Sequence, residues 1–378
     1  MRFPEFSGEW ESVILKDIAD FQKERISSEL LDERTYISTE NILQNFEGVQ
    51  SANSIPANTN VIEYKESDIL LSNIRPYLKK VWFADRTGGC SADVFVLRSR
   101  SCEPKYLYYV IASDKFINYI MSGAKGVKMP RGDKKQMECF TFSIPAIAEQ
   151  KKISRLLHLL DERITTQNKI IERYESLIRG INQYAFTNTG INYKLGEICE
   201  IRSGYSGNQL TLKNGLKVSR IETISGHKVN MERVGYVAPF ESSENYRLQI
   251  GDILFSNINS VEYIGNTAFI DKDYNLYHGM NLLRLIPKKE LVMPFYLYLV
   301  LNTNRLLNHF KTVCNKAVSQ ASINQTELGK TIVRIPNLMN QNRICELFQT
   351  LYTKLEAERY FISLLQDQKQ HLLRQMFI

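Results

Sequence analysis

Residues 146–186 read AIAEQKKISRLLHLLDERITTQNKIIERYESLIRGINQYAF and contain no proline. Apolar side chains recur along this stretch at alternating intervals of four and three residues, and Gln167 takes one place in the series. Such spacing marks the a and d positions of a coiled coil. The apolar positions are Ile153, Leu157, Leu160, Ile164, Ile171, Tyr174, Ile178 and Ile181. The stretch therefore predicts one long helix whose apolar stripe requires a second helix to cover it.

A second stretch with the same spacing lies near the C-terminus. Its apolar positions are Ile344, Phe348, Leu351, Leu355, Ile362, Leu365, Leu372 and Met376. Polar residues interrupt the series at Glu358 and Lys369, and Glu358 corresponds to Gln167 with an offset of 358 − 167 = 191. Because these polar breaks correspond, we expect the two stretches to pair as an antiparallel coiled coil. Two unrelated, solvated helices are the alternative.

The segments that precede these helices are repeated as well. DILLSNI at 68–74 returns as DILFSNI at 252–258, with an offset of 252 − 68 = 184. Further correspondences join LKDI at 15–18 to LGEI at 195–198, YISTENI at 36–42 to VSRIETI at 218–224, PKYLY at 104–108 to PFYLY at 294–298, and Ile-Pro at 144–145 to Ile-Pro at 335–336. The offset grows from 195 − 15 = 180 to 335 − 144 = 191 and never decreases, as expected of a duplicated unit that gained residues in its loops.

The repeats and helices together predict an α+β protein in which two similar globules alternate with two long helices. Short β-like runs such as 94–97 lie among clusters of Gly, Asn, Ser and Asp, and 105–121 has the pattern of a helix. We predict globular domains at 1–143 and 191–334, and helical spacer regions at 144–190 and 335–378.

Composition narrows the class of protein. The 378 residues, 43% of them hydrophobic, suffice for a core in each globule. Six cysteines without a C-x-x-C pair, and an N-terminus MRFPEFSGEWESV without a signal-peptide pattern, favour a cytoplasmic protein with reduced thiols. The longest apolar run, 293–301, is far too short to cross a bilayer, so we expect no membrane role. Lys and Arg number 48 against 41 Asp and Glu, which favours a polyanionic partner without requiring one.

These features resemble the specificity subunit of Type I restriction-modification systems. The resemblance rests on Ile144-Pro145 followed by EQKKI at 149–153 and by Leu160-Asp161, on QYAF at 183–186, and on the Asp-Ile-Leu strand of each globule. It covers essentially the whole chain. The second copy keeps Pro336 and Gln341 but has Asn340 where the family usually has Glu.

The resemblance implies a function and a set of partners. In that family, target recognition domains alternate with conserved helical regions. Each globule would read one half of a bipartite target in double-stranded DNA, and the helices would dock two methylation subunits, which restriction or translocase subunits join. The resemblance also implies that S-adenosylmethionine, ATP and magnesium belong to the partner subunits, and that this chain has no cofactor.

Signatures of an enzyme that acts on DNA are missing from the sequence. It has no G-x-x-x-x-G-K-[ST] loop and no Pro-Pro pair, so the adenine methyltransferase motif is absent. Glu63-Tyr64-Lys65 has the Glu-x-Lys shape of nuclease sites, but no Pro-Asp precedes it at a useful spacing, and the five histidines are isolated. We therefore expect a non-catalytic recognition subunit without catalytic residues or metal. A stand-alone DNA modification enzyme and a coiled-coil protein adaptor are the alternatives.

Candidate DNA-binding residues of the first globule lie in two basic clusters. One is KGVKMPRGDKK at 125–135, whose glycines and proline predict a loop, and the other follows the DILLSNI strand. Lys and Arg can bind phosphates, and Arg can also bind two acceptor atoms of guanine. The candidates are Arg75, Lys79, Lys80, Lys125, Lys128, Arg131, Lys134 and Lys135. Solvated basic residues are the simpler alternative.

The second globule is richer in amides at the equivalent places. NKAVSQAS at 315–322 occupies the position of the basic loop. The candidates are Arg220, Asn257, Asn259, Lys316, Ser319 and Gln320. Since Asn and Gln can pair with adenine through two hydrogen bonds, this composition hints at A·T pairs in the second half-site. Ordinary turn residues are the alternative.

Overall fold

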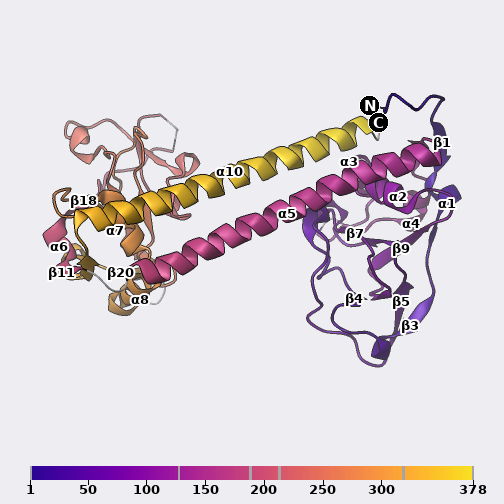
Figure 1. Cartoon of the computed structure of the whole chain (residues 1–378), viewed down its shortest axis with the longest axis horizontal. Coiled ribbons are helices and arrows are strands. Elements are labelled where there is room, and N and C mark those ends of the chain that lie inside the picture. Colours follow the sequence, from indigo (N-terminus) through magenta and orange to yellow (C-terminus); the bar gives the residue numbers. More distant parts are fainter. Residues whose placement is uncertain (1, 127, 187–189, 212–213, 317–319, 377–378) are drawn as a thin grey trace. The chain divides into compact units, whose positions relative to one another are not determined.

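The computed structural model describes residues 2–126, 128–186, 190–211, 214–316 and 320–376 (Figure 1). The chain divides into two compact units. Unit 1 comprises residues 1–169 and 359–378, and unit 2 comprises residues 170–358. Each unit holds one globular domain and a part of both long helices, so each can be described by itself.

The globular domain of unit 1 mixes short helices with sheets. Its strands are β1 (Glu11–Ile14), β2 (Ala19–Phe21), β3 (Arg25–Ser27), β4 (Tyr36–Ile37), β5 (Asn60–Tyr64), β6 (Ile69–Ser72), β7 (Val81–Phe83), β8 (Gly88–Cys90), β9 (Val94–Ser99) and β10 (Thr141–Ile144). Its helices are α1 (Leu15–Ile18), α2 (Pro104–Ile111), α3 (Asp114–Ser122) and α4 (Lys134–Glu138), with 3-10 turns η1 (Ser28–Leu30), η2 (Gln44–Phe46) and η3 (Pro76–Leu78). The strands form sheets in the orders β2-β9-β6-β7, β3-β5-β8-β4 and β1-β10.

The globular domain of unit 2 repeats much of this plan. Its strands are β11 (Ile191–Lys194), β12 (Cys199–Ser203), β13 (Leu216–Val218), β14 (Gly235–Val237), β15 (Ile253–Ser256), β16 (Ile258–Asn259), β17 (Thr267–Phe269), β18 (Leu282–Pro287), β19 (Asn315–Lys316), β20 (Ala321–Ser322) and β21 (Ile332–Ile335). Its helices are α6 (Leu195–Ile198), α7 (Pro294–Leu301), α8 (Asn304–Val313) and α9 (Gln325–Gly329), with 3-10 turns η4 (Ile221–Ile224), η5 (Met231–Arg233) and η6 (Ser243–Tyr246). The four-stranded sheet has the order β12-β18-β15-β17, which matches β2-β9-β6-β7.

The repeated heptapeptide forms the same buried strand in both sheets. Every residue of β6 and of β15 is buried. The Asp before each strand closes the preceding turn, because Asp68 Oδ2 accepts from Lys65 N at 2.7 Å and Asp252 Oδ2 accepts from Gln249 N at 2.6 Å. Each Asp also pairs with an arginine of the adjacent strand, Arg98 on β9 or Arg284 on β18. The repetition of DIL therefore preserves a strand and the capped turn that begins it.

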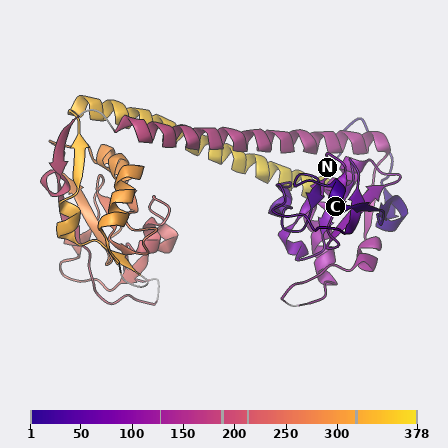
Figure 2. The same cartoon turned by 90° about the horizontal axis from the view of Figure 1, so that it is seen from below.

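The two predicted long helices are α5 (Ile147–Ala185) and α10 (Leu338–Met376), which lie side by side in each unit (Figures 1 and 2). In unit 1 the early residues of α5 share a core with the late residues of α10. This core includes Ile153, Leu157, Leu160, Leu365, Leu372 and Met376, with Ile164 half-buried beside it. In unit 2 the late residues of α5 meet the early residues of α10. That cluster includes Ile178, Phe348, Leu351 and Leu355, with Ile171, Tyr174, Ile181 and Ile344 half-buried beside it. The antiparallel pairing is thereby confirmed.

The polar interruptions of the apolar series are accommodated in different ways. Lys369 pairs with Asp161 of α5 at 2.5 Å, so this break becomes an ion pair between the helices. Gln167 is buried, and Glu358 is half-buried. Ile362 is also half-buried, and it belongs to neither of the hydrophobic clusters formed by the described residues.

A buried glutamine joins each long helix to its globular domain. The amide oxygen of Gln150 accepts from Glu103 N at 2.9 Å, and its nitrogen donates to Pro145 O at 2.8 Å. In unit 2 the Gln341 oxygen accepts from Met293 N at 2.7 Å, and its nitrogen donates to Pro336 O at 2.8 Å. Glu103 and Met293 are the N-caps of α2 and α7. The shared proline and glutamine thus belong to one joint.

The departure at Asn340 has a structural explanation. Glu149, at the corresponding position of unit 1, is buried and accepts from Arg2 Nε at 3.1 Å and Arg2 Nη2 at 2.9 Å. Arg2 precedes the first repeated segment. The backbone N–H of Asn340 instead donates to Asn337 Oδ1 at 2.9 Å, within the first turn of α10. The substitution therefore affects a contact with the N-terminal segment and leaves the glutamine joint in place.

None of the helices in the described part of the chain has both the length and the apolar character needed to cross a membrane.

We predict that Gln341→Ala destabilises the protein by about 1–3 kcal/mol, because it removes a buried amide and leaves the Met293 N–H without its acceptor. Urea denaturation would measure the free energy of unfolding. Gln349→Ala is the matched control, since Gln349 is exposed on the same helix and its loss should change stability by less than about 0.5 kcal/mol. Equal effects of the two substitutions would contradict the role of the joint.

Candidate nucleic-acid interface

In unit 1, isolated β-bridges join the basic stretch that begins at Lys125 to the segment that follows β6, which holds Arg75. Lys125 and Arg131 exchange backbone hydrogen bonds of 3.0 and 2.9 Å and so pair as the two antiparallel arms of a hairpin. The same hairpin bonds to the segment that follows β6: Arg75 N donates to Pro130 O at 2.8 Å, and Gly132 N donates to Asn73 O at 3.2 Å. Residues far apart in sequence are thereby brought together.

Unit 2 contains an equivalent element. β16 pairs with β20, and β20 pairs with β19. Ile323 N also donates to Asn257 O at 2.9 Å, so the hairpin is again attached to the segment after the repeated strand. We call these two elements the hairpin sheets, formed by residues 73–75 with 125–126 and 128–132 in unit 1 and by 257–259 with 315–316 and 320–323 in unit 2. Residues 127 and 317–319, including the candidate Ser319, lie outside the described residues.

The predicted basic loop at 125–135 is a hairpin followed by a helix. Lys134 and Lys135 are the first residues of α4, because Asp133 caps that helix by accepting from Lys135 N at 2.8 Å. Asp133 also accepts from Lys125 Nζ at 2.9 Å, and this hydrogen bond lowers the pKa of the Asp133 carboxyl. The expectation of an irregular loop over the whole stretch was therefore wrong for its last two lysines. They remain beside the hairpin sheet through Asp133.

Several candidate cations of unit 1 already have partners. Arg131 pairs with Asp93 at 3.3 Å, Lys79 with Asp114 at 2.6 Å and Lys134 with Glu138 at 3.7 Å. Lys80 donates to the Thr39 carbonyl, and burial lowers the pKa of Lys80. Within the residues that the structure describes, Lys128 and Lys135 are exposed and form no ion pair. They are the most available charges of this surface.

Arg75 occupies an unusual position beside the hairpin. Its backbone is left-handed, with φ of 52°, which few residues other than glycine adopt. Its Nε atom is buried and, among the described residues, lacks a hydrogen-bond partner. The structure thus holds the Arg75 side chain against the surface while leaving part of its hydrogen-bonding capacity unused.

The candidates of unit 2 differ in their surroundings. Asn259 is engaged locally, since its Nδ2 donates to Ser256 Oγ at 3.0 Å and its Oδ1 accepts from Ser260 N at 2.8 Å. Lys316 and Gln320 are exposed on the hairpin sheet. Arg220 lies outside this sheet, immediately before η4, with its Nε 3.5 Å from Glu222.

One asparagine of the hairpin sheets was not among the residues that the sequence indicated. The Oδ1 atoms of Asn73 and Asn257 are both buried, and neither has a hydrogen-bond partner among the described residues. The two asparagines lie at the same place in the repeats, with the offset of the repeated strands (257 − 73 = 184). Only Asn257 was a candidate from sequence, although the repeated SNI tripeptide could also have indicated Asn73.

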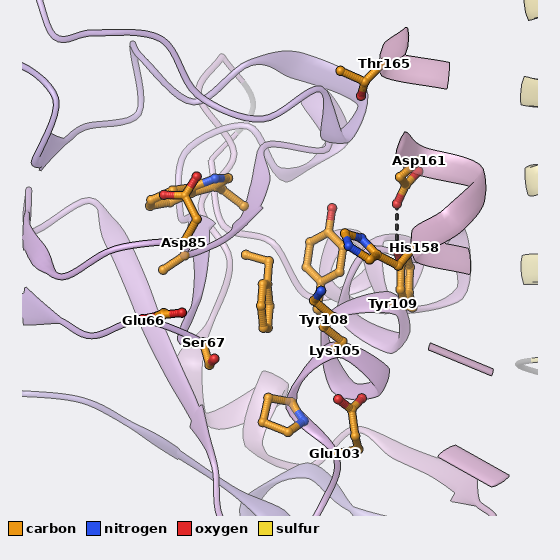
Figure 3. Close-up of a pocket in the computed structure, with 14 residues that line it drawn as sticks. Glu66, Ser67, Asp85, Glu103, Lys105, Tyr108, Tyr109, His158, Asp161 and Thr165 are labelled. Carbon is orange, nitrogen blue, oxygen red and sulfur yellow. Dashed lines mark hydrogen bonds between the residues drawn. The ribbon is translucent and has the colours of Figure 1, made fainter. Parts of the chain in front are cut away.

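A cleft of about 800 Å³ in unit 1 lies away from the hairpin sheet, between β7, α2 and α5 (Figure 3). Asp161, one of the acidic residues that line it, accepts from Tyr109 Oη at 2.7 Å and also pairs with Lys369. Burial raises the pKa of Tyr108, so its hydroxyl stays protonated. Because its carboxylate is already bonded to Tyr109 and Lys369, Asp161 is poorly suited to act as a general base. A similar cleft of about 440 Å³ in unit 2 lies between Phe269, Tyr298 and Tyr352.

Comparison with known proteins identifies the family. The model of the Type I restriction modification DNA specificity domain matches residues 7–175 and again 191–361. The putative type I restriction enzyme MjaX specificity subunit of Methanocaldococcus jannaschii is 38% identical over 188 residues, which are 49% of this chain and 44% of that relative. The MjaVIII specificity subunit of the same organism is 25% identical over 395 residues, covering 95% of this chain and 89% of that relative. The match to MjaX therefore spans less than half of that protein's length.

Solved structures share the fold. The S subunit of a Type I restriction-modification system from M. genitalium superposes with a TM-score of 0.64 at 17% identity, covering 98% of this chain and 96% of that one. A chain from a structure of the type I R-M system, solved to explain complex assembly and conformational transition, gives a TM-score of 0.61 at 20% identity, covering 97% and 96%. With both halves of the sequence matching the same family, this chain belongs to the Type I restriction modification DNA specificity family and carries two DNA specificity domains.

Proposed function

We propose that this chain is the DNA-recognition subunit of a Type I restriction-modification complex, and that each hairpin sheet contacts one half of a bipartite duplex target. The target recognition domains would be residues 1–143 and 191–334. The observation that carries the proposal is the pair of hairpin sheets, which share a backbone arrangement but present different side chains. Two domains that share a backbone scaffold but differ in their surface side chains are suited to recognise two different half-sites.

The side chains of the first hairpin sheet suit the DNA backbone. Lys128 and Lys135 are exposed and free to bind phosphates. Lys125 and Arg131 have carboxylate partners, but these pairs are largely exposed, and exposed pairs contribute only about 0–1 kcal/mol. Lys125 and Arg131 could therefore leave these carboxylates and bind DNA phosphates at little cost in free energy.

The second hairpin sheet suits a contact of lower charge. Gln320 is exposed on this element, whereas the amide oxygen of Asn257 is buried and lacks a hydrogen-bond partner among the described residues. Amides bind the N6 and N7 edge of adenine. This side-chain content supports an A·T-containing second half-site.

The long helices would dock the partner subunits. Both carry leucines that are exposed in the described structure, Leu159 and Leu177 on α5 and Leu347 and Leu364 on α10. Exposed leucines on a helix are suited to pack against another protein. We propose two methylation subunits as the first partners and restriction or translocase subunits as later ones, in the cytoplasm.

The chemistry would belong to those partners. S-adenosylmethionine, ATP and magnesium are assigned to them, and this chain acts by binding and positioning. Methylation assays on the purified chain alone test this assignment, since activity without added subunits would identify a stand-alone modification enzyme. An assembled complex that binds no DNA would identify a protein adaptor.

Charge reversal at Lys125, Lys128 and Arg131, each changed to Glu, should weaken DNA binding by the reconstituted complex. Each lost phosphate contact should reduce the slope of log affinity against log salt by about 0.9. We expect the clearest change for Lys128→Glu, because Lys128 has no competing carboxylate among the described residues. Fluorescence anisotropy over a range of salt concentrations measures these slopes.

Lys65→Glu is the control for these variants. Lys65 is also exposed, but it lies before β6, at the end of the strand opposite the hairpin sheet. Its reversal should leave the salt slope unchanged. A slope that is unaltered in all three hairpin variants would show that the hairpin sheet lies off the DNA.

Exchange of residues 191–334 for the matching domain of another family member should change one half of the methylated sequence. The physical reason is that each domain carries its own sheet, core and hairpin. Mapping methylated positions in a host genome, with the parent and the chimaeric gene, measures the outcome. Alteration of both halves, or of neither in an active complex, would show that the domains do not read independently.

A further inference from the structure

The turn that follows each repeated strand is itself repeated. It spans positions 75–79 in the first globular domain and positions 261–265 in the second. Ser72 N donates to Lys80 O at 3.0 Å and Ser256 N donates to Asn266 O at 2.8 Å, so the same backbone bond closes both turns. The last residue of each turn is left-handed: φ is 54° at Lys79 and 84° at Gly265. The two turns are thus built alike.

A tyrosine occupies the same place in both turns. Tyr77 and Tyr263 are related by 263 − 77 = 186, the offset that also relates the first residues of β7 and β17 (267 − 81 = 186). The two residues are nearly equally exposed, at 48% and 49%. The residue after each tyrosine points the other way, since Ile264 is fully buried and Leu78 is half-buried. Each turn therefore anchors one apolar side chain and presents a tyrosine to solvent.

The hydroxyl groups of these tyrosines are available to a ligand. Neither Tyr77 nor Tyr263 has a side-chain hydrogen bond among the described residues. An aromatic ring retained for core packing would be buried, and a hydroxyl retained for the fold would have an internal partner. The repetition of this tyrosine thus calls for a role outside the domain core.

Both tyrosines stand next to a hairpin sheet. Arg75, two residues before Tyr77, donates its backbone N–H to the hairpin at Pro130. In unit 2, Tyr263 N donates to Ser260 O at 3.0 Å, and Ser260 follows directly after β16 of the hairpin sheet. Within each unit, a DNA half-site that contacts the hairpin sheet would therefore pass close to the tyrosine beside it.

We propose that the hydroxyls of Tyr77 and Tyr263 each donate a hydrogen bond to a backbone phosphate of the DNA, one in each half-site. This inference rests on the proposed function. The candidate DNA-binding residues of the two hairpin sheets differ, so they can read different bases. A tyrosine that is the same in both units is better suited to a contact that is the same in both half-sites. Contacts to phosphates position a protein on the duplex without reading sequence, and tyrosine is among the residues that make them. In an intact duplex the bases are stacked on one another, so the rings of Tyr77 and Tyr263 cannot stack on them.

Tyr77→Phe and Tyr263→Phe test the proposal in the full chain reconstituted with methylation subunits. Phenylalanine keeps the ring and removes only the hydroxyl, so the turn should fold as before. Each variant should bind roughly tenfold more weakly or worse, as expected for loss of one hydrogen bond to an anionic phosphate. The loss should be equal on a labelled duplex with the mapped target and on one with scrambled half-sites, and the double variant should show about the product of the two losses.

The salt slope provides an independent readout. A neutral donor displaces no counterion, so both variants should keep the parent slope while affinity falls. Tyr193→Phe is the control, because Tyr193 lies half-buried on β11 against the domain core, and its variant should bind as the parent does.

The outcomes separate this inference from the proposed function. Unchanged affinity in the Phe variants, with weakened binding by Lys128→Glu, would overturn the tyrosine contacts and leave the DNA surface in place. A loss confined to the target duplex would also overturn the inference, since the hydroxyl would then read a base. Unchanged binding in every variant would reject the hairpin surface itself.

Discussion

The arrangement of each unit depends on one buried amide. Gln150 and Gln341 bond at once to the Ile-Pro segment before a long helix and to the N-cap of a short helix in the globular domain. An amide has both a donor and an acceptor, so one side chain can satisfy a backbone N–H and a backbone C=O that would otherwise be buried without partners. The direction in which each long helix leaves its domain is thereby fixed by hydrogen bonds as well as by apolar packing.

A second constraint acts inside the sheets. Arg284 and Asp252 are only 6% and 4% exposed, and burial raises the pKa of Asp252 even with the arginine beside it. A buried pair of this kind contributes little net stability but makes the loss of either partner costly. The turn that Asp252 caps is therefore tied to the neighbouring strand, which keeps β15 and the hairpin sheet after it in one position.

Sequence periodicity predicted the long helices well because the apolar pattern within each helix is local and regular. Ile153, Leu157 and Leu160 lie on one face simply by their spacing, and the second series identified the partner. The hairpin sheets were harder, because the pairing of Asn73 with Gly132 joins residues that no local pattern relates. Glycines and a proline indicated a loop at Lys134 and Lys135, whereas the side chain of Asp133 caps a short helix there. Ion pairs such as Arg131 with Asp93 likewise depend on contacts distant in sequence.

The hairpin sheets are attached to their domains through main-chain hydrogen bonds, such as Arg75 N to Pro130 O and Ile323 N to Asn257 O. Backbone bonds of this kind do not depend on which side chains the paired residues carry. Substitutions on the outer face of the hairpin can therefore accumulate without loss of the strand pairing that holds it. In evolutionary terms, side chains on this surface can change without disturbing the fold. A duplicated gene segment can therefore diverge toward a new DNA preference while its ancestor's architecture persists.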